Sequence, residues 1–177
     1  MRITAGEMRS RIVPVANVPG LRPTPAKVRQ ALFNMLGSVE DFDMLDLFSG
    51  SGIMALEALS RGAKSAQSIE LHHLAAKCLQ QTREHLKLED RWHIKQMSVE
   101  KGIKLLSGSS FDLIFADPPY AQGEAENVLQ LLDQHGITAH QLVIEESARY
   151  QPLWPEGWIC QDSRRYGDSC LHFLLRK

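Results

Sequence analysis

Residues that could do chemistry gather at the end of the segment Phe111–Tyr120, whose sequence is F-D-L-I-F-A-D-P-P-Y. Its apolar residues predict a buried strand. The prolines at 118 and 119 end that strand, because proline has no N–H to donate to a sheet. Asp117 and Tyr120 are therefore placed on a rigid turn just past the carboxyl end of a strand. Ligands of open α/β sheets bind at such strand ends.

An acid, a stiff carbonyl and an aromatic ring suit methylation of an exocyclic amine on a nucleobase. Such an amine is a poor nucleophile because its lone pair is delocalised, so its two N–H groups need two acceptors. The Asp117 carboxylate and the Pro118 carbonyl can accept them, and Pro119 fixes the direction of that carbonyl. Stacking of the base on Tyr120 would contribute about 1–3 kcal/mol. The candidate catalytic residues are therefore Asp117, Pro118, Pro119 and Tyr120; an ordinary turn that caps a strand is the alternative.

A second motif, Ser49-Gly50-Ser51-Gly52, follows the apolar run Met44–Phe48 and precedes a predicted helix. Gly50 and Gly52 allow a tight turn and a close approach of the backbone to a ligand, although a G-x-G-x-x-A pattern alone fits helix packing equally well. Glu70 ends the next predicted strand, 20 residues after Gly50. A carboxylate there can accept both hydroxyls of a ribose. This context favours a nucleoside-containing cofactor.

Asp46 favours S-adenosylmethionine over a nicotinamide cofactor. A carboxylate four residues before Gly50 would repel a pyrophosphate, whereas it can orient the cationic amino-acid half of S-adenosylmethionine. The N-terminus of the helix after the loop can then face the carboxylate of that ligand. The candidate cofactor-binding residues in this part of the chain are Asp46, Phe48, Ser49, Gly50, Ser51, Gly52, Glu70 and Leu71.

The elements that must position these residues alternate between strand and helix. After a helix at 26–36, for which Thr24 is a suitable N-cap, the patterns predict five strands with helices between them. Two further strands, 157–160 and 170–175, are joined by a polar loop and predict an antiparallel pair. The fold class is therefore α/β, a doubly wound Rossmann-like sheet with antiparallel C-terminal edge strands. The five strands are 44–48, 65–71, 92–97, one from 111 onward and 141–145, and the helices between them are 53–59, 72–88, 99–106 and 123–135.

Composition indicates one ordinary globular domain, residues 1–177. The chain is 44% apolar, with a formal net charge of −1 and no run of about 18 apolar residues that could span a membrane. Three scattered cysteines indicate free thiols in a cytoplasmic protein, and the histidines show no metal-ligand spacing. Within this domain we expect a basic N-terminal arm, residues 1–24, ahead of a core at 25–177. The arm contains a short β-hairpin at 2–15 and a rigid linker at 18–25, which is rich in proline and glycine.

Basic charge is concentrated at the start of the chain. Residues 1–35 contain six arginines and lysines against one acidic residue, Glu7. From charge alone, a polyanion-binding surface and a solvated face are equally good interpretations.

Several blocks together resemble the RsmD family of bacterial 16S ribosomal RNA guanine-N2 methyltransferases. The resemblance spans essentially the whole chain, including the opening R-I-T-A-G-E-M-R-S-R and the closing R-R-Y-G-D-S-C-L-H-F. D-P-P-Y alone marks amino-methyltransferases in general, whereas R-P-T and L-F-N ahead of the glycine motif are more specific. The blocks are R-P-T at 22–24, V-R-Q-A-L-F-N at 28–34, L-D-L-F-S-G-S-G at 45–52, L-E-A-L-S-R-G-A at 56–63 and D-P-P-Y at 117–120.

The resemblance implies a class I fold that uses S-adenosylmethionine and releases S-adenosylhomocysteine, with no metal. It places the adenine contact near Ser98 and Val99, where Ser98 is shorter than the acidic or amide residue common in the family. The implied partner is 16S rRNA in a small ribosomal subunit or assembly intermediate. Nothing in the sequence suggests more than a monomer. Arg22 and Thr24 could face either cofactor or RNA. The candidate RNA-phosphate contacts are Arg9, Arg11, Arg22, Lys27 and Arg29, with Arg164 and Arg165 in the tail loop.

Three other functions fit parts of the pattern. A DNA or RNA adenine-N6 methyltransferase could use the same D-P-P-Y turn, but no separate sequence-reading module is evident. A nicotinamide oxidoreductase is disfavoured by Asp46 and by the lack of a Tyr-x-x-x-Lys motif or a catalytic histidine pair. A non-enzymatic RNA-binding module would not need the D-P-P-Y turn, the glycine motif and Glu70 all intact.

Overall fold

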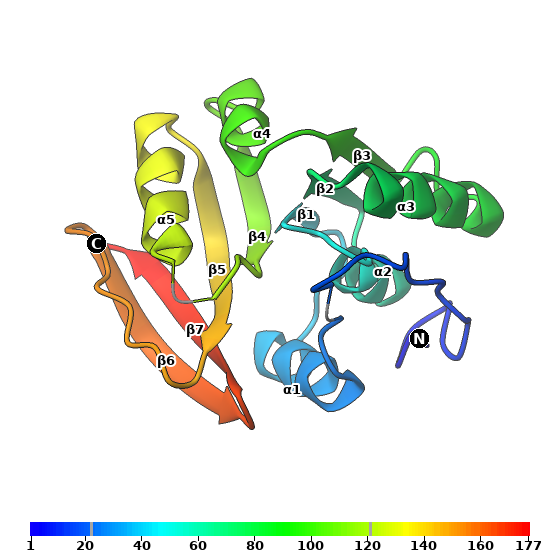
Figure 1. Cartoon of the computed structure of the whole chain (residues 1–177), viewed down its shortest axis with the longest axis horizontal. Coiled ribbons are helices and arrows are strands. Elements are labelled where there is room, and N and C mark those ends of the chain that lie inside the picture. Colours follow the sequence, from blue (N-terminus) through cyan, green and yellow to red (C-terminus); the bar gives the residue numbers. More distant parts are fainter. Residues whose placement is uncertain (22, 121) are drawn as a thin grey trace.

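The computed structural model describes residues 1–21, 23–120 and 122–177, and its strands form a seven-stranded sheet covered by helices (Figure 1). The strand order is β3-β2-β1-β4-β5-β7-β6; the first five strands pair in parallel, and β7 pairs antiparallel with both β5 and β6. The strands are β1 (Asp43–Leu47), β2 (Ser65–Glu70), β3 (Trp92–Gln96), β4 (Ser110–Ala116), β5 (Thr138–Ser147), β6 (Trp158–Tyr166) and β7 (Ser169–Arg176). The helices are α1 (Ala26–Leu36), α2 (Ile53–Ser60), α3 (His73–Leu86), α4 (Val99–Leu105) and α5 (Glu124–Gln134).

Two apolar cores lie on the opposite faces of the sheet. One contains the buried side chains of α1, α2 and α3, and the other contains those of α4 and α5. Successive strand side chains point to opposite faces, so Met44 packs in the first core and Leu45 in the second. This double burial explains why β4 is continuously apolar from Leu113 to Ala116. No helix among the described residues is long and apolar enough to cross a membrane.

The C-terminal edge differs from the sequence expectation in length. The strands predicted at 157–160 and 170–175 extend to Trp158–Tyr166 and Ser169–Arg176, so most of the predicted polar loop is part of the hairpin. The expectation failed because β6 is an edge strand, whose many exposed positions carry polar side chains without an apolar pattern. Arg164 and Arg165 therefore lie in β6 and not in a loop.

The hairpin expected at residues 2–15 is present as a compact turn-rich structure closed by one antiparallel bridge between Arg2 and Ile12. The main-chain N–H of Ile3 donates to the carbonyl of Arg11 at 3.1 Å, and that of Val13 donates to the carbonyl of Met1 at 2.8 Å. Ile3 and Val13 are buried in the same core as α1 and α2. Apolar packing therefore holds this part of the arm on the body of the protein.

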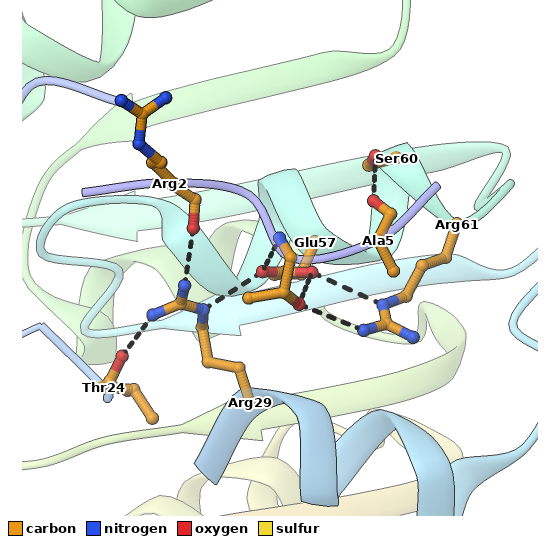
Figure 2. A network of polar contacts seen from close by, with 8 residues as sticks. Arg2, Ala5, Thr24, Arg29, Glu57, Ser60 and Arg61 are labelled. Carbon is orange, nitrogen blue, oxygen red and sulfur yellow. Dashed lines mark hydrogen bonds and ion pairs between the residues drawn. The ribbon is translucent and has the colours of Figure 1, made fainter. Parts of the chain in front are cut away.

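Glu57 of α2 fastens the arm through a buried polar network (Figure 2). Its carboxylate, which is fully buried, accepts hydrogen bonds from the N–H of Thr4 at 2.8 Å and from the Thr4 hydroxyl at 2.9 Å. It also forms ion pairs with Arg29 at 3.1 Å and Arg61 at 3.4 Å. Because a buried charge is costly without partners, these contacts fix the arm, α1 and α2 to one another.

Arg29 is a structural residue and not the RNA contact that the sequence analysis expected. Only 3% of it is exposed, and each guanidinium nitrogen has a partner. Nε contacts Glu57, Nη1 donates to the carbonyl of Thr24 at 2.6 Å, and Nη2 donates to the carbonyl of Arg2 at 2.7 Å. Thr24 also departs from expectation, because α1 has no side-chain N-cap and the Thr24 hydroxyl donates to Glu145 at 3.3 Å.

Gly6 is the point at which this docking tolerates no side chain. Its φ is +79°, and a Cβ there would lie 1.6 Å from the carbonyl oxygen of Ser60. We predict that Gly6→Ala lowers the free energy of unfolding by about 3 kcal/mol or more, because the clash separates the arm from α2 and removes the hydrogen bonds that the buried Glu57–Arg29 pair makes with Thr4 and Arg2. Gly108→Ala is the matched control, with φ +75° and nothing near its Cβ, and should cost about 1–2 kcal/mol. Urea denaturation measures both, and equal losses would contradict the docking.

Candidate active site

A cavity of about 860 Å³ brings together the two motifs found in the sequence. It is lined by the glycine motif after β1, by the end of β2, by the start of α4 and by the turn after β4. All four candidate catalytic residues line it. So do the candidate cofactor residues except Gly52, namely Asp46, Phe48, Ser49, Gly50, Ser51, Glu70, Leu71, Ser98 and Val99.

Pairing of β1 with β4 brings the candidate-site acids Asp46 and Asp117 close to each other. Asp46 is in register with Phe115, and the N–H of Asp117 donates to the carbonyl of Leu47 at 3.4 Å. Because side chains alternate along a strand, Asp46 and Asp117 point to the same face of the sheet as Phe115. The glycine motif with Asp46 and the turn Asp117–Tyr120, about 70 residues apart in the chain, therefore line the same cavity.

Asp46 is a buried carboxylate, with 1% of the residue exposed. The hydroxyl of Ser49 donates to it at 2.5 Å. Burial is the main cause that raises the pKa of Asp46 to about 7, and the nearby charge of Glu70 acts in the same direction. A cationic ligand group beside it would lower that pKa and stabilise the carboxylate.

Glu70 organises the glycine motif as well as facing the cavity. Its Oε2 accepts a hydrogen bond from the N–H of Gly50 at 2.7 Å, and its Oε1 accepts one from the N–H of His72 at 2.6 Å. A carboxylate oxygen can accept more than one hydrogen bond, so both oxygens retain capacity for ligand hydroxyls. The sequence analysis expected only the ligand contact and missed the loop contact.

The two glycines of the motif have different roles. Both have positive φ, +55° at Gly50 and +69° at Gly52. A Cβ at Gly52 would lie 2.6 Å from atoms of Leu79 and Trp92, whereas the nearest neighbour of a Cβ at Gly50 would be Leu21, at an ordinary contact distance of 3.6 Å. Gly52 therefore permits close packing beneath the loop and does not line the cavity, which corrects its expected role as a cofactor contact. Gly50 does line it.

Ser98 and Leu71 both line the cavity. The Ser98 hydroxyl accepts a hydrogen bond from the N–H of Lys101 at 3.3 Å and thereby caps α4. Capping already uses one acceptor position of this hydroxyl. Its expected contact with adenine stays a prediction. Leu71 is 68% exposed although it borders the cavity, so it offers an apolar surface at the mouth.

The turn Asp117–Tyr120, which we call the acceptor turn, contains two groups whose pKa values are raised by burial and by neighbouring acids. Burial raises the pKa of Asp117 well above its usual range, and the charges of Glu145, Asp46 and Glu146 act in the same direction. Burial and the charge of Asp117 also raise the pKa of Tyr120. The phenol of Tyr120 donates to Oε1 of Glu145 at 3.0 Å and lies 3.0 Å from the hydroxyl of Ser169.

Sequence reasoning missed two parts of the cavity wall and one acid that supports it. Glu145 does not line the cavity itself, but it accepts hydrogen bonds from Tyr120 and Thr24, which do. It was expected only as the end of a strand, although acids that end an apolar run such as Q-L-V-I-E-E are a usable signal. The linker contributes Val18, Gly20, Leu21, Pro23 and Thr24, so Thr24 faces the cavity, while Arg22 lies outside the described residues. Helix α5 and the residues before it contribute Gln122, Glu124, Asn127, Val128 and Leu131.

The candidate RNA contacts that the structure describes do not line the cavity. Arg9 and Arg11 are exposed on the arm, Lys27 is exposed on α1, and Arg165 is exposed on β6. Among the described residues, no group of three or more histidine, cysteine, aspartate or glutamate side chains is arranged to hold a metal ion.

This strand order, with a cavity at the carboxyl ends of the parallel strands, defines a class I methyltransferase fold, the fold that uses S-adenosylmethionine. The chain belongs to the family described as Conserved hypothetical protein 95, the RsmD family, whose model matches residues 1–175. Both findings confirm the resemblance and the fold class predicted from the sequence.

Individual relatives agree over nearly the full chain. The ribosomal RNA small subunit methyltransferase D of Escherichia coli strain K12 is 34% identical over 181 residues, covering 100% of this chain and 90% of that protein. The protein of the same name from Haemophilus influenzae is 36% identical over 172 residues, covering 94% and 89%. The solved structure of the candidate methyltransferase yhhF from Escherichia coli matches with a TM-score of 0.86 at 31% identity, covering 100% and 98% of the two chains.

The raised pKa of Asp46 leads to a prediction about stability. The folded protein binds this proton more tightly than the unfolded chain does, so the free energy of unfolding falls as the pH rises from about 4 to about 7. We predict that Asp46→Asn reduces the fall between pH 5 and pH 8 by about 2–3 kcal/mol, because asparagine can still accept from Ser49 but does not ionise. Urea denaturation at each pH measures it; Asp90→Asn, at an exposed position, should leave the fall unchanged.

Proposed function

We propose that this protein transfers a methyl group from S-adenosylmethionine to the exocyclic N2 amine of a guanine in 16S ribosomal RNA. The substrate would be a small ribosomal subunit or an assembly intermediate in the cytoplasm, and the enzyme would act as a monomer. The observation that carries the proposal is the single cavity in which Asp117 and Tyr120 face the glycine motif and Asp46. The names of the full-length relatives support ribosomal RNA of the small subunit as the substrate.

The cavity suits S-adenosylmethionine. The buried carboxylate of Asp46 favours a cation, which fits the ammonium group of the ligand's amino-acid half. Glu70 has capacity for the ribose hydroxyls, and the Gly50 backbone allows close approach. Ser98, Val99 and Leu71 would flank the adenine. When bound, the cofactor supplies a methyl group activated by its attachment to a sulfonium.

The residues of the acceptor turn would hold and activate the guanine. The Asp117 carboxylate and the Pro118 carbonyl would accept the two N–H groups of the amine, so that its nitrogen can direct a lone pair at the methyl carbon. A raised pKa makes Asp117 a better acceptor for the proton that the amine releases. Tyr120, 39% exposed, offers its ring to a base withdrawn from its stack. Alignment of the reacting atoms supplies much of the rate enhancement.

The adenine-N6 alternative uses the same turn, because any exocyclic amine has two N–H groups to be accepted. The relatives' names favour ribosomal RNA, and the guanine itself rests on the family resemblance. A nicotinamide oxidoreductase is disfavoured by the geometry, since Asp46 is buried where a pyrophosphate would need neutral or positive surroundings.

Asp117 provides the direct test. We predict that Asp117→Ala and Asp117→Asn lower methyl transfer to small ribosomal subunits by about a hundredfold or more, because both remove the proton acceptor. Transfer is measured with labelled S-adenosylmethionine and subunits from a strain that lacks the protein, followed by mapping of the methylated base. Asp90→Asn, an exposed change, should retain wild-type activity.

Binding of S-adenosylhomocysteine separates loss of chemistry from loss of fold. Both Asp117 variants should still show a thermal shift with this product, and neither should respond to NAD. A wild-type protein that methylates adenine in DNA and leaves every form of ribosomal RNA unmodified would refute the proposed substrate.

RNA binding should depend on the exposed arginines of the arm. Arg9 and Arg11 are exposed, and neither forms an ion pair within the described residues. We predict that Arg9→Ala/Arg11→Ala raises the KM for RNA several-fold. The slope of log KM against log salt concentration should fall by about one for each lost phosphate contact.

The matched control for this pair is Lys104→Ala. Lys104 is also exposed, but it lies in the last turn of α4, away from the arm. The KM for S-adenosylmethionine should stay constant in both variants, because neither site lines the cavity. An unchanged salt slope in the double arginine variant would place the RNA elsewhere.

A further inference from the structure

We propose that Glu145 is a positioning residue that fastens Tyr120 of the acceptor turn to the linker, so that the ring is held at a fixed place over the target base. This inference rests on the proposed methyl transfer and adds to it the group that orients the stacking surface. Glu145 would not touch the base itself. Its effect would pass through the hydroxyl of Tyr120 on one side and Thr24 on the other.

The geometry that supports this role joins three segments at one carboxylate. Oε1 of Glu145 accepts from the phenol of Tyr120 at 3.0 Å, and Oε2 accepts from the hydroxyl of Thr24 at 3.3 Å. Glu145 lies near the end of β5, Tyr120 ends the acceptor turn, and Thr24 belongs to the linker, 121 residues from Glu145 in the chain. Each oxygen therefore holds a different wall of the cavity.

Burial makes this carboxylate a firm attachment point. Glu145 is 2% exposed and Thr24 6%, whereas Tyr120 is 39% exposed. An exposed aromatic ring on a short turn keeps rotational freedom unless its polar end is bound. Hydrogen bonds to a charged group contribute about 1.5–3 kcal/mol, enough to select one ring orientation from several.

The linker side of the attachment is itself held in place. The carbonyl of Thr24 accepts from Arg29, and Arg29 pairs with the buried Glu57 (Figure 2). Thr24 is therefore bound at its backbone by the network that docks the arm and at its hydroxyl by Glu145. Tyr120 consequently takes its position from a rigid part of the molecule.

Ser169 is the second partner of the phenol and provides a matched control. Its hydroxyl lies 3.0 Å from that of Tyr120, but Ser169 is only half-buried and carries no charge. If any polar neighbour sufficed to orient the ring, loss of Ser169 would be as harmful as loss of Glu145. Our proposal predicts that it is not.

The test compares five variants in steady-state methylation of small ribosomal subunits. Tyr120→Phe and Glu145→Ala should each lower kcat about tenfold, the loss expected for one charge-assisted hydrogen bond. The double variant should be no slower than the slower single one, because both changes break the same bond. Glu145→Gln should stay within about threefold of the wild type, since its amide oxygen can still accept from Tyr120. Ser169→Ala should stay within about twofold.

Two further readouts separate positioning from a general structural effect. The KM for S-adenosylmethionine should be unchanged in all five variants, and their melting temperatures should not track kcat. If Glu145→Ala does not fold, the pair Tyr120→Phe and Glu145→Gln still decides: the first must be slow and the second fast. Additive losses in the double variant, a wild-type kcat in Tyr120→Phe, or equal losses in Glu145→Gln and Glu145→Ala would each overturn the proposal.

Failure of the proposed substrate is recognised from the wild type alone. If it methylates adenine in RNA or DNA and not guanine, the guanine assignment is wrong, and the same five variants on the adenine substrate decide the role of Glu145. If the wild type methylates none of these polynucleotides, both proposals are overturned.

Discussion

The parallel pairing of β1 with β4 is the constraint on which the site depends. The chain leaves β1 for β2 and β3 on one side and returns at β4 on the other, so β1 and β4 are neighbours whose following loops diverge in opposite directions. A cleft forms where neighbouring loops separate, which is why sheets of this class bind ligands at that point. The bond from the N–H of Asp117 to the carbonyl of Leu47 continues the pairing to the start of the acceptor turn. Donor and acceptor chemistry thus meet without any specialised domain.

The same constraint concentrates negative charge in a poorly solvated place. Burial raises the pKa of Asp117, and the charges of Glu145, Asp46 and Glu146 act in the same direction; the pKa of Asp46 is also raised mainly by burial. Such acids make the ligand-free protein less stable near neutral pH than a neutral cavity would. In the proposed reaction, a cationic ligand and an amine that donates hydrogen bonds would offset that cost, so the ligands would be selected by charge. The site is therefore tuned for binding at the expense of stability.

The sequence predicted the parts of this structure that depend on local pattern. Apolar runs located the buried parallel strands, and the prolines after Asp117 located the acceptor turn, because both depend on residues next to one another. Arg29 was misassigned since nothing near it in the chain shows that Glu57 will be its buried partner. Gly52 was misassigned for a similar reason: its contacts, Leu79 and Trp92, come from later elements. The predicted length of β6 was too short, because an edge strand needs no apolar alternation that would mark its full extent.

The buried Glu57 network illustrates why an ion pair can be retained although it adds little to stability. Desolvation of Glu57 and Arg29 offsets most of their attraction, and an apolar pair of similar size could be as stable. An apolar pair, however, would accept several positions of the arm, whereas a carboxylate with four fixed donors accepts one. That position decides where Thr24 lies in the cavity wall. The arm is therefore part of the architecture of the site. The basic residues at the start of the chain divide into two kinds: Arg29 of α1 is buried and fixes geometry, whereas Arg9 and Arg11 of the arm are exposed and are the proposed RNA contacts.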